Sequence, residues 1–191
     1  MQTILKPLAL AGLVLASAMA FADEYSDTID VFKKAGESAK FFDSAYGYAV
    51  FPSIGKGGLG VGAAHGNGRV YEQGKYVGDT SMTQVSIGLQ AGGQAFSQVI
   101  FFEDKKSFDE FTSGNFEFGA GVGAVAITAG ASASTGSTGT STGHSGNKED
   151  ATTHGKYHKG MAVFTVAKGG LMYEASVAGQ KFKYKKKAGD A

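Results

Sequence analysis

The residues best suited to chemistry form the run Gly55-Lys56-Gly57-Gly58-Leu59-Gly60, which has the spacing G-x-G-x-x-G. In dinucleotide-binding proteins this spacing lies between a strand and a helix, and the helix N-terminus faces the pyrophosphate. Here residues 61–68 follow, with three more glycines and an Asn-Gly pair. Because such glycine density does not sustain a helix, the sequence predicts no nucleotide site, and we expect no cofactor.

Metal and catalytic sites are not favoured either. His154 and His158 are four residues apart, a helical metal-ligand spacing, but no third ligand lies near them in the sequence, so we expect solvated histidines and no metal. The chain has no cysteine, which excludes thiolate ligands, disulfides and a thiol nucleophile. Acidic pairs such as Glu103-Asp104 are adjacent, and adjacent side chains point apart. We therefore expect no catalytic residues and no enzyme activity.

The N-terminal sequence indicates an export signal. An almost unbroken apolar run, Leu8 to Ala20, is too short to span a bilayer comfortably, and it leads into the small-x-small pattern Ala20-Phe21-Ala22. Residues 1–22 are therefore predicted to be a signal peptide. We expect a periplasmic protein, with secretion as the second choice.

Charge and composition narrow the partner classes. Removing Lys6 with the leader takes the formal charge from +1 to 0, which argues against nucleic-acid binding. The C-terminus is nevertheless crowded with lysines, at 181, 183, 185, 186 and 187. Thirty glycines with only two prolines indicate curved strands rather than a disordered chain.

Residues 23–42 are predicted to form an amphipathic helix. Its apolar positions, which include Ile29 and Phe32, recur at three- and four-residue spacing, and the charged residues fall mostly elsewhere. Two interpretations remain open from this pattern. The apolar face packs on a sheet, or it meets a membrane surface with its lysines toward anionic headgroups.

The rest of the chain predicts one α+β domain over residues 23–191. From Gly47 onward we expect a twisted, mostly antiparallel sheet of about eight or nine short strands, curling toward a barrel or sandwich. Turns are expected at Gly66-Asn67-Gly68 and at Gly92-Gly93, and a short helix after Asp104. The Ser/Thr/Gly-rich residues 132–156 are predicted to be a flexible loop.

Several long segments resemble the SYLF domain. They include Tyr48–Gly62, Gly68–Tyr71, Gly93–Gln98 and Ala167–Glu174. The resemblance implies a non-catalytic lipid-binding domain. In eukaryotic relatives this domain recognises phosphoinositides and acts beside the actin cytoskeleton. For an exported bacterial member the resemblance implies binding of anionic phospholipid or docking on a membrane surface.

The resemblance also suggests candidate lipid-binding residues. A membrane-facing helix would use Ile29 and Phe32 together with three lysines, Lys33, Lys34 and Lys40. From charge and turn chemistry we add three basic residues beside the Gly-rich turns as phosphate contacts, Lys56, Arg69 and Lys168.

Two other functions remain as alternatives. One is a structural or stress-related envelope protein that acts through contacts with an unidentified protein partner. The other is an outer-membrane β-barrel, which the absence of tryptophan and the lysine-rich C-terminus disfavour.

Overall fold

The computed structural model describes residues 24–119, 124–127, 156–168, 177 and 179–189. The predicted signal peptide and nearly all of the predicted loop at 132–156 lie outside these residues, as does His154.

A single long β-hairpin dominates the sheet. Strand β1 (Gly47–Glu72) has 26 residues, and β2 (Lys75–Phe102) has 28. They pair antiparallel from Gly47 opposite Phe102 to Glu72 opposite Lys75. The connecting residues, Gln73 and Gly74, both have positive φ, at 48° and 80°, the backbone sign that tight two-residue hairpins need.

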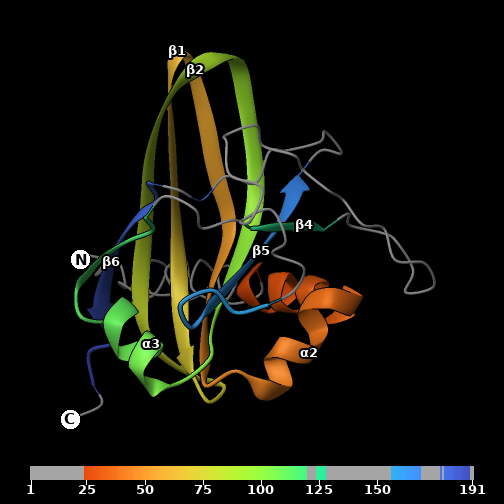
Figure 1. Ribbon diagram of the computed structural model, residues 1–191, viewed down its shortest axis with the longest axis vertical. Helices are drawn as coiled ribbons and strands as arrows, with labels where there is room; N and C mark the ends of the chain where they lie inside the picture. Colours follow the sequence, from red (N-terminus) through yellow and green to blue (C-terminus); the bar gives the residue numbers. More distant parts are fainter. Residues whose placement is uncertain (1–23, 120–123, 128–155, 169–176, 178, 190–191) are drawn as a thin grey trace, which may run out of the picture.

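Both turns predicted from glycine pairs are wrong. Gly66 lies inside β1, opposite Met82, and Gly93 lies inside β2, opposite Gly57. The hairpin instead bends over on itself, as Figure 1 shows. A Cβ atom on Gly66 would lie 2.6 Å from Cγ1 of Ile54, earlier in the same strand. Glycine is required here because the two halves of the bent strand approach each other closely.

Four shorter strands complete the sheet. They are β3 (Asn115–Glu117), β4 (Val125–Ile127), β5 (Met161–Lys168) and β6 (Lys181–Lys186). The strand order is β3-β6-β2-β5-β4, with β1 also on β2, and the described pairings are antiparallel except β4 with β5. The α+β class and the mostly antiparallel sheet are confirmed. The six described strands differ from the expected eight or nine short ones because the bend keeps each hairpin arm continuous, and the sheet path ends at β3 and β4 without closing.

The predicted helices are both present. The N-terminal helix spans residues 24–34 and continues, after a break at Ala35, as α2 (Gly36–Ser44). Across the break, the buried Ser38 hydroxyl donates to the carbonyl of Phe32, which satisfies an acceptor that the helix end exposes. Helix α3 (Lys105–Phe111) is capped by Asp104, whose Oδ1 accepts from the Ser107 amide at 2.8 Å.

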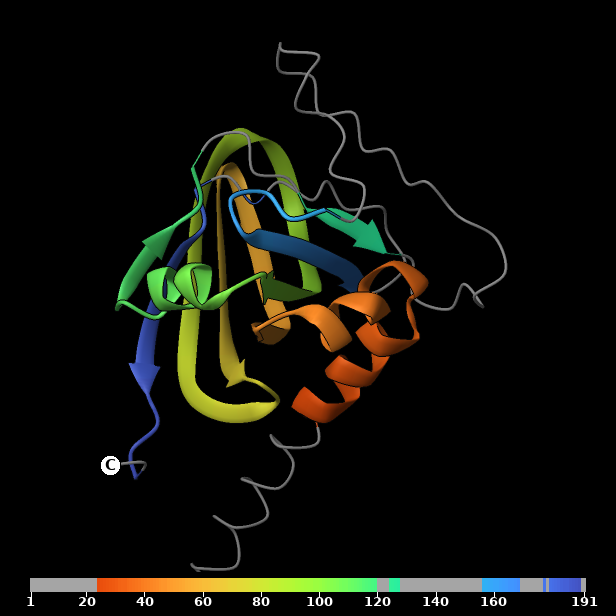
Figure 2. The same cartoon turned by 60° about the horizontal axis from the view of Figure 1, so that its bottom comes forward.

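The two halves of the bent sheet have different outer faces. Residues 96–102 of β2 are buried without interruption, because one face lines the interior of the bend and the other lies under the N-terminal helices. Residues 61–70 of β1 instead alternate between exposed or partly exposed and buried. In Figure 2 the N-terminal helices lie on one side of the sheet, and β6 lies on the other, near α3. One half of the sheet is therefore covered by helix, and the outer face of the other half is left exposed.

Candidate functional site

The apolar side of the N-terminal helix faces the sheet. Phe32 is 0% exposed and belongs to a cluster with Phe101 of β2 and Phe164 of β5, and Ile29 packs against the same cluster while partly buried. Of the two interpretations of this helix, the structure shows packing on the sheet. Phe32 is not on the surface that the predicted membrane contact requires, and Ile29 reaches it only in part.

The helix lysines do not form a basic surface. Lys33, Lys34 and Lys40 are exposed, but residues 24–44 carry five acidic side chains against these three, which gives a net charge of 3 − 5 = −2. Two of the ammonium groups lie over rings of the helix itself. The Nζ atom of Lys33 is 5.6 Å from the Phe42 ring centre, and that of Lys40 is 5.7 Å from the Phe41 ring centre.

Of the three basic residues predicted beside the Gly-rich turns, Lys168 and Arg69 contact the start of the N-terminal helix, and Lys56 does not share their position in the sheet. Lys56 lies in β1 opposite Gln94, and Lys168 ends β5, with its Nζ 3.7 Å from Oε1 of Glu24. Arg69 lies near the turn end of β1, and Lys56 is on the opposite face of the sheet from Lys168, because its neighbour Gly55 is the residue in register with Ala95 and Lys168. No common phosphate site follows from these positions.

Arg69 has a structural role instead. Its guanidinium carbon lies 4.4 Å from the ring centre of Tyr25, on the first helix, and 4.9 Å from that of Tyr76, on β2. The Tyr76 hydroxyl donates to Oδ1 of Asp79 at 2.7 Å. Burial, followed by this hydrogen bond, raises the pKa of Tyr76 to about 12. The cluster fastens the start of the helix to the turn end of the hairpin.

A stronger basic surface lies on the exposed half of the sheet. Directly opposite residues in neighbouring strands project on the same face. The register places Arg69 opposite Asp79 and Asp79 opposite Lys185, and it aligns Lys183 and Lys181 on the next rows. By the same alternation Val61 and Val85 lie on this face, toward the bend. We call these residues the basic sheet face: Val61, Val85, Lys181, Lys183 and Lys185. Arg69 and Asp79 form its edge, where Tyr25 of the N-terminal helix packs on the Arg69 guanidinium.

The basic sheet face is accessible. Val61 is 60% exposed and Val85 is 72% exposed, which places both among the exposed large apolar side chains of the protein. Lys181 Nζ lies 3.8 Å from Glu117 Oε2. Within the part of the chain that the structure describes, neither Lys183 nor Lys185 has a carboxylate oxygen within 4 Å. The sequence contains a pattern that indicates this face, because lysines at every second position, 181, 183 and 185, project on one face of a strand.

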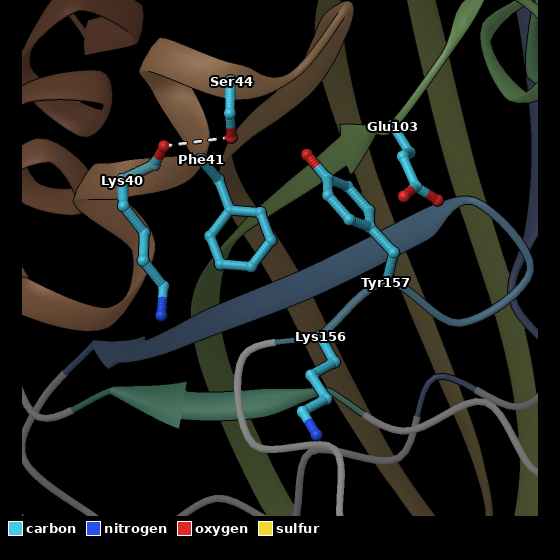
Figure 3. Close-up of a pocket in the computed structure, with 6 residues that line it drawn as sticks. All are labelled: Lys40, Phe41, Ser44, Glu103, Lys156 and Tyr157. Atoms are coloured by element: carbon cyan, nitrogen blue, oxygen red, sulfur yellow. Dashed lines mark hydrogen bonds between the residues drawn. The ribbon is translucent and has the colours of Figure 1, made fainter.

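A second feature is an open pocket of about 500 Å³ between α2 and the segment before β5. Figure 3 shows its lining, which combines aromatic, basic and acidic side chains: Lys40, Phe41, Ser44, Glu103, Lys156 and Tyr157.

Two further properties concern the described residues alone. No three of their His, Asp or Glu side chains gather closely enough to hold a metal ion. None of their helices combines the length and apolar character needed to cross a bilayer.

Comparison with known proteins adds a family and a relative. The Ysc84 family, described as "Las17-binding protein actin regulator", matches residues 83–191, from within β2 to the C-terminus. Beta cell expansion factor A of Aeromonas veronii is 34% identical over 158 residues. That alignment covers 81% of this chain and 51% of the relative, so the chain spans about half the length of the curated relative it matches.

Proposed function

We propose that this protein, a member of the Ysc84 (SYLF) family, is a non-catalytic module that docks on anionic phospholipid membranes. The chain belongs to that family because the match covers more than half of its residues. The family is known for lipid binding and actin-regulator roles and is generally non-catalytic. The proposal adds the lipid class and the surface that contacts it.

The observation that carries the proposal is the basic sheet face. Three lysines on one exposed strand suit an anionic surface, where each basic residue contributes about 1 kcal/mol. Val61 and Val85 supply apolar area at the edge of this charge, as interfacial binding needs. The face therefore combines both attractions that hold a peripheral protein on a bilayer.

The membrane in question belongs to the cell envelope. The predicted leader at residues 1–22 supports export, and we place the protein in the periplasm, with secretion second.

Flotation with liposomes of graded anionic lipid content tests the proposal. The informative variant is Lys183→Gln with Lys185→Gln, and its matched control is Lys33→Gln with Lys34→Gln, which removes the same charge from the helix. Losing two basic contacts costs about 2 kcal/mol, so the sheet variant should partition roughly 30-fold more weakly. The helix control should stay close to wild type, and about 0.5 M salt should release the wild-type protein.

The reverse pattern, in which the helix control loses binding and the sheet variant keeps it, would refute the assignment to the basic sheet face. If the wild-type chain floats at no anionic content, membrane docking itself is refuted. The alternative is then an envelope protein that acts through protein contacts, which cross-linking in an envelope extract would address.

A further inference from the structure

A histidine lies within the basic sheet face, in the row where the apolar edge of the face meets the first lysine of β6. His65 is paired with Thr83 of β2, and Thr83 is paired in turn with Lys181. The side chains of Val61, Ala63 and His65 are all exposed at alternate positions of β1, so they project on one face. His65 therefore belongs to the same surface as the exposed valines and the lysines.

The folded chain leaves the His65 imidazole without an ion pair. Among the described residues, no carboxylate oxygen lies within 4 Å of it, and its cross-strand neighbour Thr83 carries no charge. The register places four basic and two acidic side chains on the same face: Arg69, Lys181, Lys183, Lys185, Asp79 and Glu117. Their formal charge is 4 − 2 = +2, and a proton on His65 raises it to +3. Tyr25, which packs on Arg69, stays uncharged at neutral pH because burial raises its pKa.

A histidine at this position lets the charge of the surface change near neutral pH. Histidine is the side chain that ordinarily titrates between about pH 5 and 8, whereas lysine and arginine keep their charge over that range. A membrane that contacts Val61 and Arg69 also contacts His65, because His65 lies between them on one face of β1. Anionic headgroups attract the imidazolium and gain no such attraction from the neutral imidazole.

We propose that His65 is a membrane contact of the basic sheet face, and that its protonation strengthens docking on anionic phospholipid as the pH falls. This inference rests on the proposed function, since it adds a contact residue and a mode of regulation to the same surface. Docking and protonation reinforce each other, because a surface that binds the imidazolium form more tightly makes the bound protein take up protons. One added basic residue corresponds to about a fivefold gain in affinity.

Flotation at two pH values, about 8 and about 5.5, tests the proposal with vesicles of phosphatidylglycerol and phosphatidylcholine in one fixed ratio. The phosphodiester of phosphatidylglycerol stays ionised at both, so a change in binding reports on the protein. Wild type should bind about fivefold more tightly at the lower pH. His65→Gln should match wild type at the higher pH and show no gain at the lower. His65→Lys should bind about fivefold more tightly than wild type at the higher pH and gain little further.

His158→Gln is the matched control. His158 precedes β5, which pairs with residues 95–102 of β2, in the half of the sheet that the N-terminal helices cover. This variant should respond to pH as wild type does. Because the His65 side chain is exposed and has no ion pair among the described residues, both His65 variants should melt close to the wild-type temperature. Their changes in flotation then report on binding and not on folding.

Proton uptake gives a second readout. Calorimetric titration of vesicles near neutral pH, in two buffers that differ in ionisation enthalpy, measures the protons taken up on docking. Wild type should take up a fraction of one proton, and His65→Gln should take up less.

The outcomes separate this inference from the proposed function. If wild type floats equally at both pH values, or if His65→Gln keeps the gain at the lower pH, the inference is overturned while docking on anionic membranes stands. If wild type floats at neither pH, the inference and the proposed function fail together.

Discussion

Replacing Phe32 by alanine decides whether the N-terminal helix serves the core or a membrane. Phe32 is 0% exposed and packs among side chains from three strands: Val50, Val99, Phe101, Phe164 and Val166. The carbonyl of Phe32 also accepts from the buried Ser38 hydroxyl, so the chain is fixed at this point. The substitution removes a ring from a closed layer between helix and sheet.

The expected cost follows from this burial. Phe→Ala substitutions in closed cores cost about 3–5 kcal/mol, from lost transfer free energy and the cavity left behind. That is a large part of the roughly 5–15 kcal/mol that stabilises a typical domain. An aromatic ring held in solvent for membrane contact would give the opposite result, because its removal would leave the free energy of unfolding nearly unchanged.

Urea unfolding followed by far-UV circular dichroism measures the difference, with Val31→Ala as the matched control. Val31 neighbours Phe32 on the same helix but is 41% exposed, so its truncation should change stability by less than about 0.5 kcal/mol. Vesicle flotation of both variants is measured in parallel. The packing argument is refuted if Phe32→Ala unfolds at the same urea concentration as Val31→Ala while losing vesicle binding.

Three further predictions concern two sites in the protein interior and the stability of the fold at alkaline pH. Gln98 and Gln180 are both 0% exposed and exchange two amide hydrogen bonds of 2.9 and 3.1 Å. Changing either one to leucine should lower the free energy of unfolding by about 1–3 kcal/mol. In a urea double-mutant cycle, the double variant should lose less than the sum of the two single variants. Gly68→Ala should lower the urea midpoint, because its Cβ would lie 2.7 Å from an aromatic ring of the same strand, whereas Gly55→Ala, with nothing within 4 Å, should be tolerated. The pKa of Tyr76 is raised from 10.0 to about 12, so its contribution to stability is complete below pH 10 and is lost as the pH rises toward 12. In a plot of melting temperature against pH, the fall between pH 10 and 12 should be smaller for Tyr76→Phe than for wild type.

The elements with local signals could be predicted from sequence. The amphipathic spacing around Ile29 and Phe32 gave the N-terminal helix, and Asp104 marked the start of α3. The turn predicted at Gly66-Asn67-Gly68 is absent. A turn and a close approach between strand halves both require glycine, and the sequence alone does not distinguish the two causes. The true turn, Gln73-Gly74, carries a weaker local signal.

The candidate site was harder to predict because it depends on strand register. An amphipathic helix has the same sequence pattern whether its apolar side meets a sheet or a bilayer. The contacts of Phe32 with the sheet distinguish the two cases, and they are visible only in the three-dimensional structure. The alternation of Lys181, Lys183 and Lys185 was visible in the sequence. Its alignment with Arg69 and with the exposed valines required the pairing of β6 with β2 and of β2 with β1.

The lysines of β6 are better explained by an anionic partner than by stability. Residues two apart on one strand face lie about 7 Å apart, so two ammonium groups repel by about 0.6 kcal/mol in water before salt screening. Lys181 recovers part of that through Glu117, at an exposed contact of small value. Lys183 and Lys185 have no such ion pair among the described residues. The N-terminal helices do not cover them, because those helices lie over the other half of the bent sheet. An anionic surface would turn each of these repelling charges into a favourable contact, whereas the folded chain by itself gains little from placing them side by side.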